Sequence, residues 1–162
     1  MGSGISTKYQ LNPYYGEMEV RESDSMYRRV FDEDYLDEFC REMIERPEVE
    51  GSSMDKNYLK VQYKYPIRTG GNLGHKTDHT GFNNFYSDNP MKDAMELYSN
   101  LSNGSATRIQ DDVVLSKFKD GDIVSFRPYT STSGSPAVDI KVVSSSILRK
   151  QRIHFLLWEL LK

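Results

Sequence analysis

Two stretches of the chain place hydrophobic residues at helical spacing. In residues 32–46 apolar side chains recur every three or four positions, and Pro47 ends the pattern. In residues 89–103 Pro90 suits the first turn and Gly104 follows the last one. We therefore expect two amphipathic helices. The second has this buried stripe: Met91, Ala94, Met95, Tyr98 and Leu101.

Alternation of apolar and polar residues predicts strands elsewhere. It runs through residues 58–65 and recurs in four later segments: 113–118, 122–129, 137–143 and 151–158. Asp120 and Gly121 mark a hairpin between the first two of these. Residues 66–88 contain four glycines and little periodicity, so we expect a long loop there. Helices precede strands, which predicts an α+β fold with N-terminal helices packed on a twisted antiparallel sheet of about four to five strands.

Charge divides the chain unevenly. Residues 1–60 carry 14 acidic and 8 basic side chains, whereas residues 61–162 carry 10 acidic and 13 basic ones. We predict an acidic helical segment over residues 1–56 and a basic functional domain over residues 57–162, folded as one compact unit. No apolar run approaches the ~20 residues of a membrane helix, and no signal peptide is visible at the start. The lone Cys40 excludes an internal disulfide framework.

A polar connection follows the predicted strand that ends near Arg127. It contains hydroxyl residues at Thr130, Ser131 and Thr132. An arginine fork together with hydroxyl and backbone donors can hold one anion. The alternative is an ordinary strand connection, since Ser, Gly and Pro are common in turns.

Strand parity collects further polar residues on one face. If Val138 and Ile140 face the core, Asp139 and Lys141 face away from it. His154 points away from Ile153 and Phe155 in the last strand, and Arg127 opposes the core in its own strand. Thr130 and Thr132 would lie at the rim of this face. A solvated face with incidental charges fits the same pattern equally well.

The other two histidines lie in the segment predicted to be a loop. His75 and His79 flank Lys76 and precede Thr80. Histidine is the natural acid or base at neutral pH, although a surface histidine without a role is the plain alternative. Their spacing lacks the Cys pair or Glu of a zinc site, so we expect no metal and no cofactor. No Gly-x-Ser-x-Gly elbow occurs, which argues against serine hydrolase chemistry.

Several short motifs together resemble one known class. They are Arg-Pro-x-Thr-x-Thr from Arg127, Gly-Ser-Pro-Ala-Val-Asp-Ile from Gly134, and Arg-Ile-His-Phe from Arg152. They resemble the end of bacterial polymorphic-toxin C-terminal domains similar to the barnase–EndoU–colicin–RelE class of ribonucleases. Residues 74–81 and 98–104 resemble the earlier part of those domains, so the likeness covers roughly residues 58–156. Thr130 and Thr132 stand where such domains often have Ser.

The resemblance implies a toxin that cleaves RNA, with tRNA as one candidate, by 2′-hydroxyl attack without a metal. It also implies a cognate immunity protein and either secretion or delivery into the cytoplasm of a target cell. The residues expected to carry catalysis are His75, His79, Arg127, Thr130, Thr132 and His154. Those expected to bind substrate are Lys76, Thr80, Ser131, Asp139 and Lys141. The alternatives are a non-catalytic interaction module and a nuclease fold that binds a partner without activity.

Overall fold

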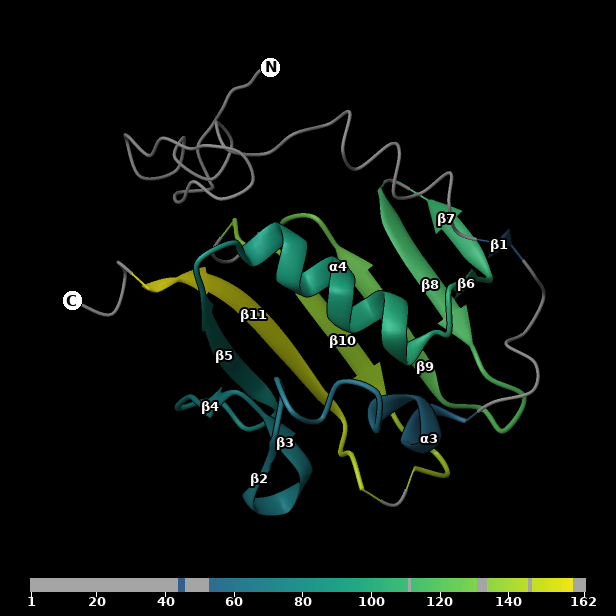
Figure 1. Cartoon of the computed structure of the whole chain (residues 1–162), viewed down its shortest axis with the longest axis horizontal. Coiled ribbons are helices and arrows are strands. Elements are labelled where there is room, and N and C mark those ends of the chain that lie inside the picture. Colours follow the sequence, from purple (N-terminus) through teal and green to yellow (C-terminus); the bar gives the residue numbers. More distant parts are fainter. Residues whose placement is uncertain (1–43, 46–52, 111, 131–133, 146, 159–162) are drawn as a thin grey trace.

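The computed structural model describes residues 44–45, 53–110, 112–130, 134–145 and 147–158. Their main feature is a seven-stranded sheet with one long helix, α4, lying across one of its faces (Figure 1). The elements in chain order are β1 Ile44–Glu45, α3 Met54–Tyr58, β2 Ile67–Arg68, η1 Thr69–Gly71, β3 Asn72–Leu73, β4 His75–Lys76, β5 Phe82–Ser87, α4 Pro90–Leu101, β6 Ser105–Ala106, β7 Arg108–Gln110, β8 Val113–Lys117, β9 Ile123–Arg127, β10 Ala137–Lys141 and β11 Gln151–Leu157.

The large sheet has the strand order β4-β5-β11-β10-β9-β8-β7. All neighbours are antiparallel except β5 and β11, which run parallel. The α+β class is confirmed, but the expected strand number is too low. The four later strands appear where alternation placed them, whereas β4, β5 and β7 extend the sheet at both edges. The hairpin at Asp120 and Gly121 is also present, with the Gly121 N–H donating to the Phe118 carbonyl at 3.0 Å.

Helix α4 forms where its sequence predicted. The Asn89 side chain caps it by accepting the Lys92 backbone N–H at 3.2 Å, and Pro90 occupies the first turn. Every residue of the predicted stripe is at most 3% exposed. The stripe packs on the inward side chains of the sheet, among them Val124, Phe126 and Phe155. The hydrophobic core therefore lies between α4 and the sheet.

Residues 58–65 are not the strand that their alternation suggested. Helix α3 ends at Tyr58, and helical turns continue beyond it, with the Tyr65 N–H donating to the Val61 carbonyl at 3.0 Å. Val61 and Tyr65 are buried, while Leu59 and Tyr63 are 54% and 78% exposed. Spacing of three to four residues, not two, therefore separates the buried positions.

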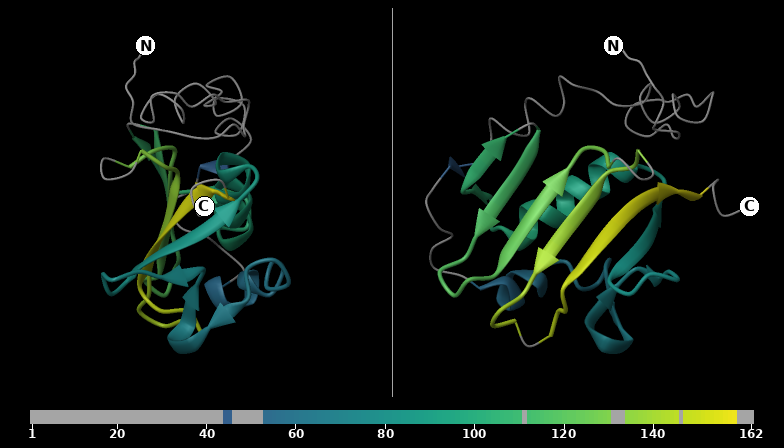
Figure 2. Two further views of the ribbon diagram at one scale, coloured as in Figure 1. Left: turned by 90° about the vertical axis from the view of Figure 1, so that its left-hand side faces the viewer. Right: turned by 180° about the vertical axis from the view of Figure 1, so that it is seen from behind.

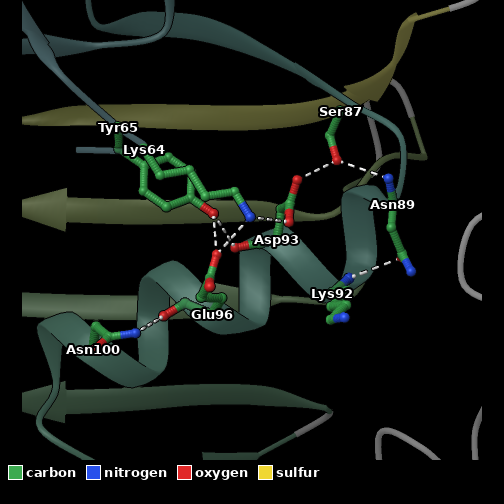
Figure 3. Close-up of polar contacts among 8 residues, drawn as sticks. All are labelled: Lys64, Tyr65, Ser87, Asn89, Lys92, Asp93, Glu96 and Asn100. Atoms are coloured by element: carbon green, nitrogen blue, oxygen red, sulfur yellow. Dashed lines mark hydrogen bonds and ion pairs between the residues drawn. The ribbon is translucent and has the colours of Figure 1, made fainter. Parts of the chain in front are cut away.

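Contacts to α4 fix this turn in place (Figure 3). The Lys64 ammonium lies 2.8 Å from carboxylate oxygens of both Asp93 and Glu96. The Tyr65 hydroxyl donates to Glu96 at 2.9 Å, and Ser87 donates to Asp93. Burial opposes the charge of Lys64, but its hydrogen bonds to the two carboxylates outweigh burial and raise its pKa. The network joins the turn, α4 and the end of β5.

The two α-helices of the described residues, α3 and α4, lie mid-chain. The helix predicted over residues 32–46 lies outside the described residues, except for Ile44–Glu45, which form β1 and pair in parallel with β6. The predicted domain boundary at residue 57 falls inside α3, whose Met54 belongs to the same core as α4. The division into two segments stays a prediction. None of the helices described is long and apolar enough to cross a membrane.

The sheet face opposite α4 carries no helix within the described part of the chain (Figure 2). Its outward side chains come from every strand of the large sheet. A site built on these side chains is therefore not covered by a helix of the described residues.

Candidate functional site

A row of backbone pairs crosses the open face and joins three of the residues singled out from sequence. Arg127 pairs with Ala137, Ala137 with His154, His154 with Asn84, and Asn84 with His75. Neighbouring strands lie about 4.8 Å apart, so the His154 backbone is roughly 10 Å from each end of the row. The predicted grouping of Arg127, Asp139, Lys141 and His154 on the face away from the hydrophobic core follows from the observed register.

Asp139 is held between two arginines. The Arg127 Nε donates to Oδ2 at 2.9 Å, while the Arg152 Nε and Nη2 donate to Oδ1 and Oδ2 at 2.5 and 3.0 Å. Burial alone would raise the pKa of Asp139, but the hydrogen bonds from Arg152 and Arg127 outweigh it and lower the pKa. The carboxylate therefore stays ionised and fixes both guanidinium groups. These contacts suit a positioning role for Asp139 better than direct contact with an anion.

A hollow of about 520 Å³ opens beside this clamp. We call it the basic hollow; its walls come from the residues before and within β5, from β9 and β10, and from the start of β11. Its lining residues are Thr80, Gly81, Phe82, Arg127, Asp139, Ile140, Lys141, Arg149, Lys150, Gln151 and Arg152. Five of these side chains are cationic and one is anionic, so the hollow is suited to an anion.

His154 is buried next to the basic hollow. Its side chain contacts the Phe82 ring at 6.1 Å between centroids, and its Nδ1 lies 3.3 Å from the Ser135 hydroxyl. It is only 6% exposed. Burial, reinforced by the charge of Arg152 and opposed by that of Asp139, lowers the pKa of His154 to about 4. The ring is therefore neutral at pH 7.

A tight turn holds His79 next to Thr80 and against Phe82, two residues that line the basic hollow. The Thr77 hydroxyl accepts the His79 N–H at 3.2 Å and donates to the Phe82 carbonyl at 2.7 Å. The His79 ring lies 6.1 Å from the Phe82 ring. Phe82 is thus in contact with both His79 and His154 and is 40% exposed. Its exposed ring is a surface on which a flat group can stack.

The remaining predicted residues are distributed more widely. His75 and Lys76 are exposed on β4, one strand beyond β5, where the His75 ring lies 5.8 Å from that of Tyr86. Thr80 and Lys141 line the basic hollow. Thr130 is 4% exposed and its carbonyl accepts the Gly134 N–H, so its side chain is enclosed. Ser131 and Thr132 lie outside the described residues.

Sequence reasoning did not select the aromatic residue and three of the five cationic residues of the basic hollow: Phe82, Arg149, Lys150 and Arg152. Arg152 shares the parity of His154 in its strand, so alternation alone was sufficient to find it. Phe82 was assigned to a loop because β5 has no clean alternation. Arg149 and Lys150 precede β11 and carried no periodic signal. Together they make the hollow far more basic than the sequence-based selection suggested.

In the described segments, no three His, Cys, Asp or Glu side chains come together in a group able to hold a metal ion. Comparison with known proteins finds no match: no family model, no curated protein and no solved structure resembles this chain significantly.

Proposed function

We propose that the protein is a bacterial toxin ribonuclease that binds single-stranded RNA on the open sheet face and cleaves it at the basic hollow. The observation that carries this proposal is the hollow itself, in which a clamped arginine pair, Lys141, Arg149 and Lys150 lie beside the exposed Phe82 ring. Cations for the phosphate and an aromatic surface for a base are the two elements of single-strand recognition.

The proposed reaction is a transesterification within the RNA. The ribose 2′-oxygen loses its proton to a base and bonds to the adjacent phosphorus. The bond from phosphorus to the 5′-oxygen breaks, and an acid protonates that leaving oxygen. The products are a 2′,3′-cyclic phosphate and a free 5′-hydroxyl, with no net change in protons.

The contacts described above suggest how the roles divide. Arg127 and Arg152 keep donors beyond those given to Asp139, and these stabilise charge on the phosphorane. His154 is neutral at pH 7, so accepting the 2′ proton is the role that its charge state suits. The exposed His79, whose ring lies against Phe82 of the basic hollow, is then the proposed donor to the leaving oxygen, with His75 as the second candidate.

A second function has one observation in its favour. A histidine that is 6% exposed with a pKa of about 4 is a weak base and is poorly accessible to a ribose. This favours a module that holds RNA or an acidic partner protein without cutting. The two functions share the basic hollow and differ only in chemistry, so a product analysis separates them.

The first prediction is cleavage that withstands chelation. Purified protein incubated with total RNA should yield fragments ending in 2′,3′-cyclic phosphate at the same rate with and without EDTA. Arg152→Lys keeps the charge but loses the paired contact to Asp139, so we expect a rate roughly a hundredfold lower, the usual cost of one transition-state donor. The exposed Lys117→Arg, outside the basic hollow, serves as the control and should cleave normally.

Three results would decide against this proposal or part of it. Intact RNA after long incubation favours the binding module. Loss of cleavage with EDTA, restored by zinc, would require a metal-dependent mechanism. If Arg152→Lys and wild type cleave RNA at equal rates, the contacts of Arg152 with Asp139 have no part in catalysis.

A toxin of this kind needs protection in the cell that makes it. We therefore also propose a cognate immunity protein, acidic where it covers the basic hollow, and secretion or delivery into a target cell. Charge complementarity supports the first of these.

A further inference from the structure

A second hollow of about 410 Å³ opens on the same face of the sheet. It lies over β7, β8 and the end of β9, whereas the basic hollow lies over β10 and β11. Arg127 lines both of them. A chain crossing the sheet from one hollow to the other therefore passes over the Arg127 side chain, which is 38% exposed.

The two hollows differ in chemistry. The basic hollow has five cationic residues in its lining, whereas the second has two, Arg108 and Arg127. Beside them the second hollow has three aliphatic lining residues: Val113, Leu115 and Pro128. The ring of Tyr129, which is 48% exposed, adds an aromatic wall. Aliphatic side chains beside a tyrosine ring accommodate a flat, weakly polar group.

The rim of the second hollow is polar. Arg108 and Gln110 both lie on its edge, and an Arg108 Nη2 donates to the Gln110 side-chain oxygen. This contact uses one Arg108 donor and the Gln110 side-chain oxygen, and both side chains carry further N–H donors. Such a rim can bond the polar edge of a heteroaromatic ring while the ring itself packs on Tyr129 and the aliphatic lining.

We propose that the second hollow holds the base of a nucleotide adjacent to the scissile phosphate, so that the RNA strand crosses β9 at Arg127. This inference rests on the proposed function and adds to it the path that the RNA strand takes across the sheet. Phosphate then lies at the basic hollow and at Arg127, and the neighbouring base lies on Tyr129. Binding thus depends on a base at one position of the strand.

The test uses a short single-stranded RNA methylated at every ribose 2′-oxygen, which binds but cannot be cut. A set of such strands carries one abasic residue at each position in turn, and affinity is measured by fluorescence anisotropy. Wild type should lose roughly tenfold in affinity at one position only, the size of one base–aromatic stack. Tyr129→Ala should lose about as much with the full strand and lose nothing further with that abasic strand, since both changes remove one contact.

Matched variants separate stacking from general effects. Tyr129→Phe keeps the ring and should bind as wild type does. Tyr63→Ala removes an even more exposed tyrosine, 78% accessible, on the turn beside α4 and should change nothing. Mapping the cut in the unmethylated strand should place the sensitive base directly beside the cleaved bond.

The outcomes distinguish this inference from the proposed function. If the strand binds and is cut but no abasic position matters, the second hollow holds no base and the nuclease proposal stands. If the base requirement and its dependence on Tyr129 hold but RNA is never cut, the hollow is a base site of a binding module. If no strand binds at all, both proposals fail.

Discussion

At the scale of single residues, His154 couples the site to the stability of the fold. Its pKa is about 4 in the folded chain and near 6.5 once exposed by unfolding. Below pH 6.5 His154 binds a proton in the unfolded chain, whereas in the folded chain it binds one only near pH 4. Stability should therefore fall as the pH drops through this window, by about 3 kcal/mol at most for one group. His154→Gln cannot take up that proton and should flatten this part of the curve.

Urea unfolding at a series of pH values measures this effect. His75→Gln, at an exposed position on β4, is the control for the substitution itself. An equal slope for His154→Gln and wild type between pH 6.5 and 4 would mean that the ring is not shielded as the contacts with Phe82 and Ser135 indicate.

The site residues that alternation could reach were those inside regular strands. Asp139, Lys141 and His154 were placed on the correct face because one residue of each strand fixes the direction of all the others. Burial of His154 was not predictable in this way, since it depends on Phe82, a residue 72 positions earlier in the chain. The ion pairs of Asp139 likewise depend on register between strands, which a single sequence does not specify.

At the scale of elements, Gly74 controls whether β4 can pair with β5. Its φ is +82°, and a Cβ added there would lie 2.6 Å from the Asn84 carbonyl oxygen. Gly74→Ala should therefore force β4 away from β5 and displace His75 from Tyr86. We expect faster hydrogen exchange at the His75 and Thr77 amides, which face β5, and a loss of stability beyond the ~1–2 kcal/mol of a left-handed alanine.

Gly104→Ala is the matched control for this change. Gly104 has a similar φ of +73°, but nothing lies within 4 Å of the Cβ position. It should show the backbone cost alone and leave exchange at β4 unaltered. Equal destabilisation by the two variants would show that the contact with Asn84 relaxes without cost and that β4 is not held by close approach.

Strand β5 shows why elements held by polar contacts are hard to predict. Its inward residues include Asn83 and Ser87, so apolar alternation is lost. The Asn83 amide donates to Asn72 and Gln151 side chains at 3.1 and 3.0 Å, which satisfies it inside the core. Helix α4, by contrast, carries capping, periodicity and a stop signal in its own residues. Local sequence signals therefore identified α4, whereas β5 is explained only by the residues that contact it in the folded chain.

At the scale of the whole molecule, the order of the elements along the chain predicted the fold class but not the number of strands in the sheet. A run of strands after a helix predicted α+β packing, and the observed layer of α4 on the sheet is that arrangement (Figure 1). The parallel pairing of β5 with β11 could not be foreseen. It joins residues about seventy positions apart, and the pairing sets the order of the strands that present the site.

Summed charge over the open face gives a prediction that does not depend on catalysis. Five cations and one carboxylate line the basic hollow, so the proposed RNA binding should weaken steeply with salt. For single strands each phosphate contact contributes about −0.7 to the slope of log affinity against log salt. Lys141→Gln should therefore make the slope less negative by about 0.7 and weaken all sequences alike. Lys119→Gln, outside both hollows at the hairpin, should leave it unchanged. If Lys119→Gln shifts the slope and Lys141→Gln does not, the RNA follows the outer edge of the sheet instead, and the basic hollow serves another anion.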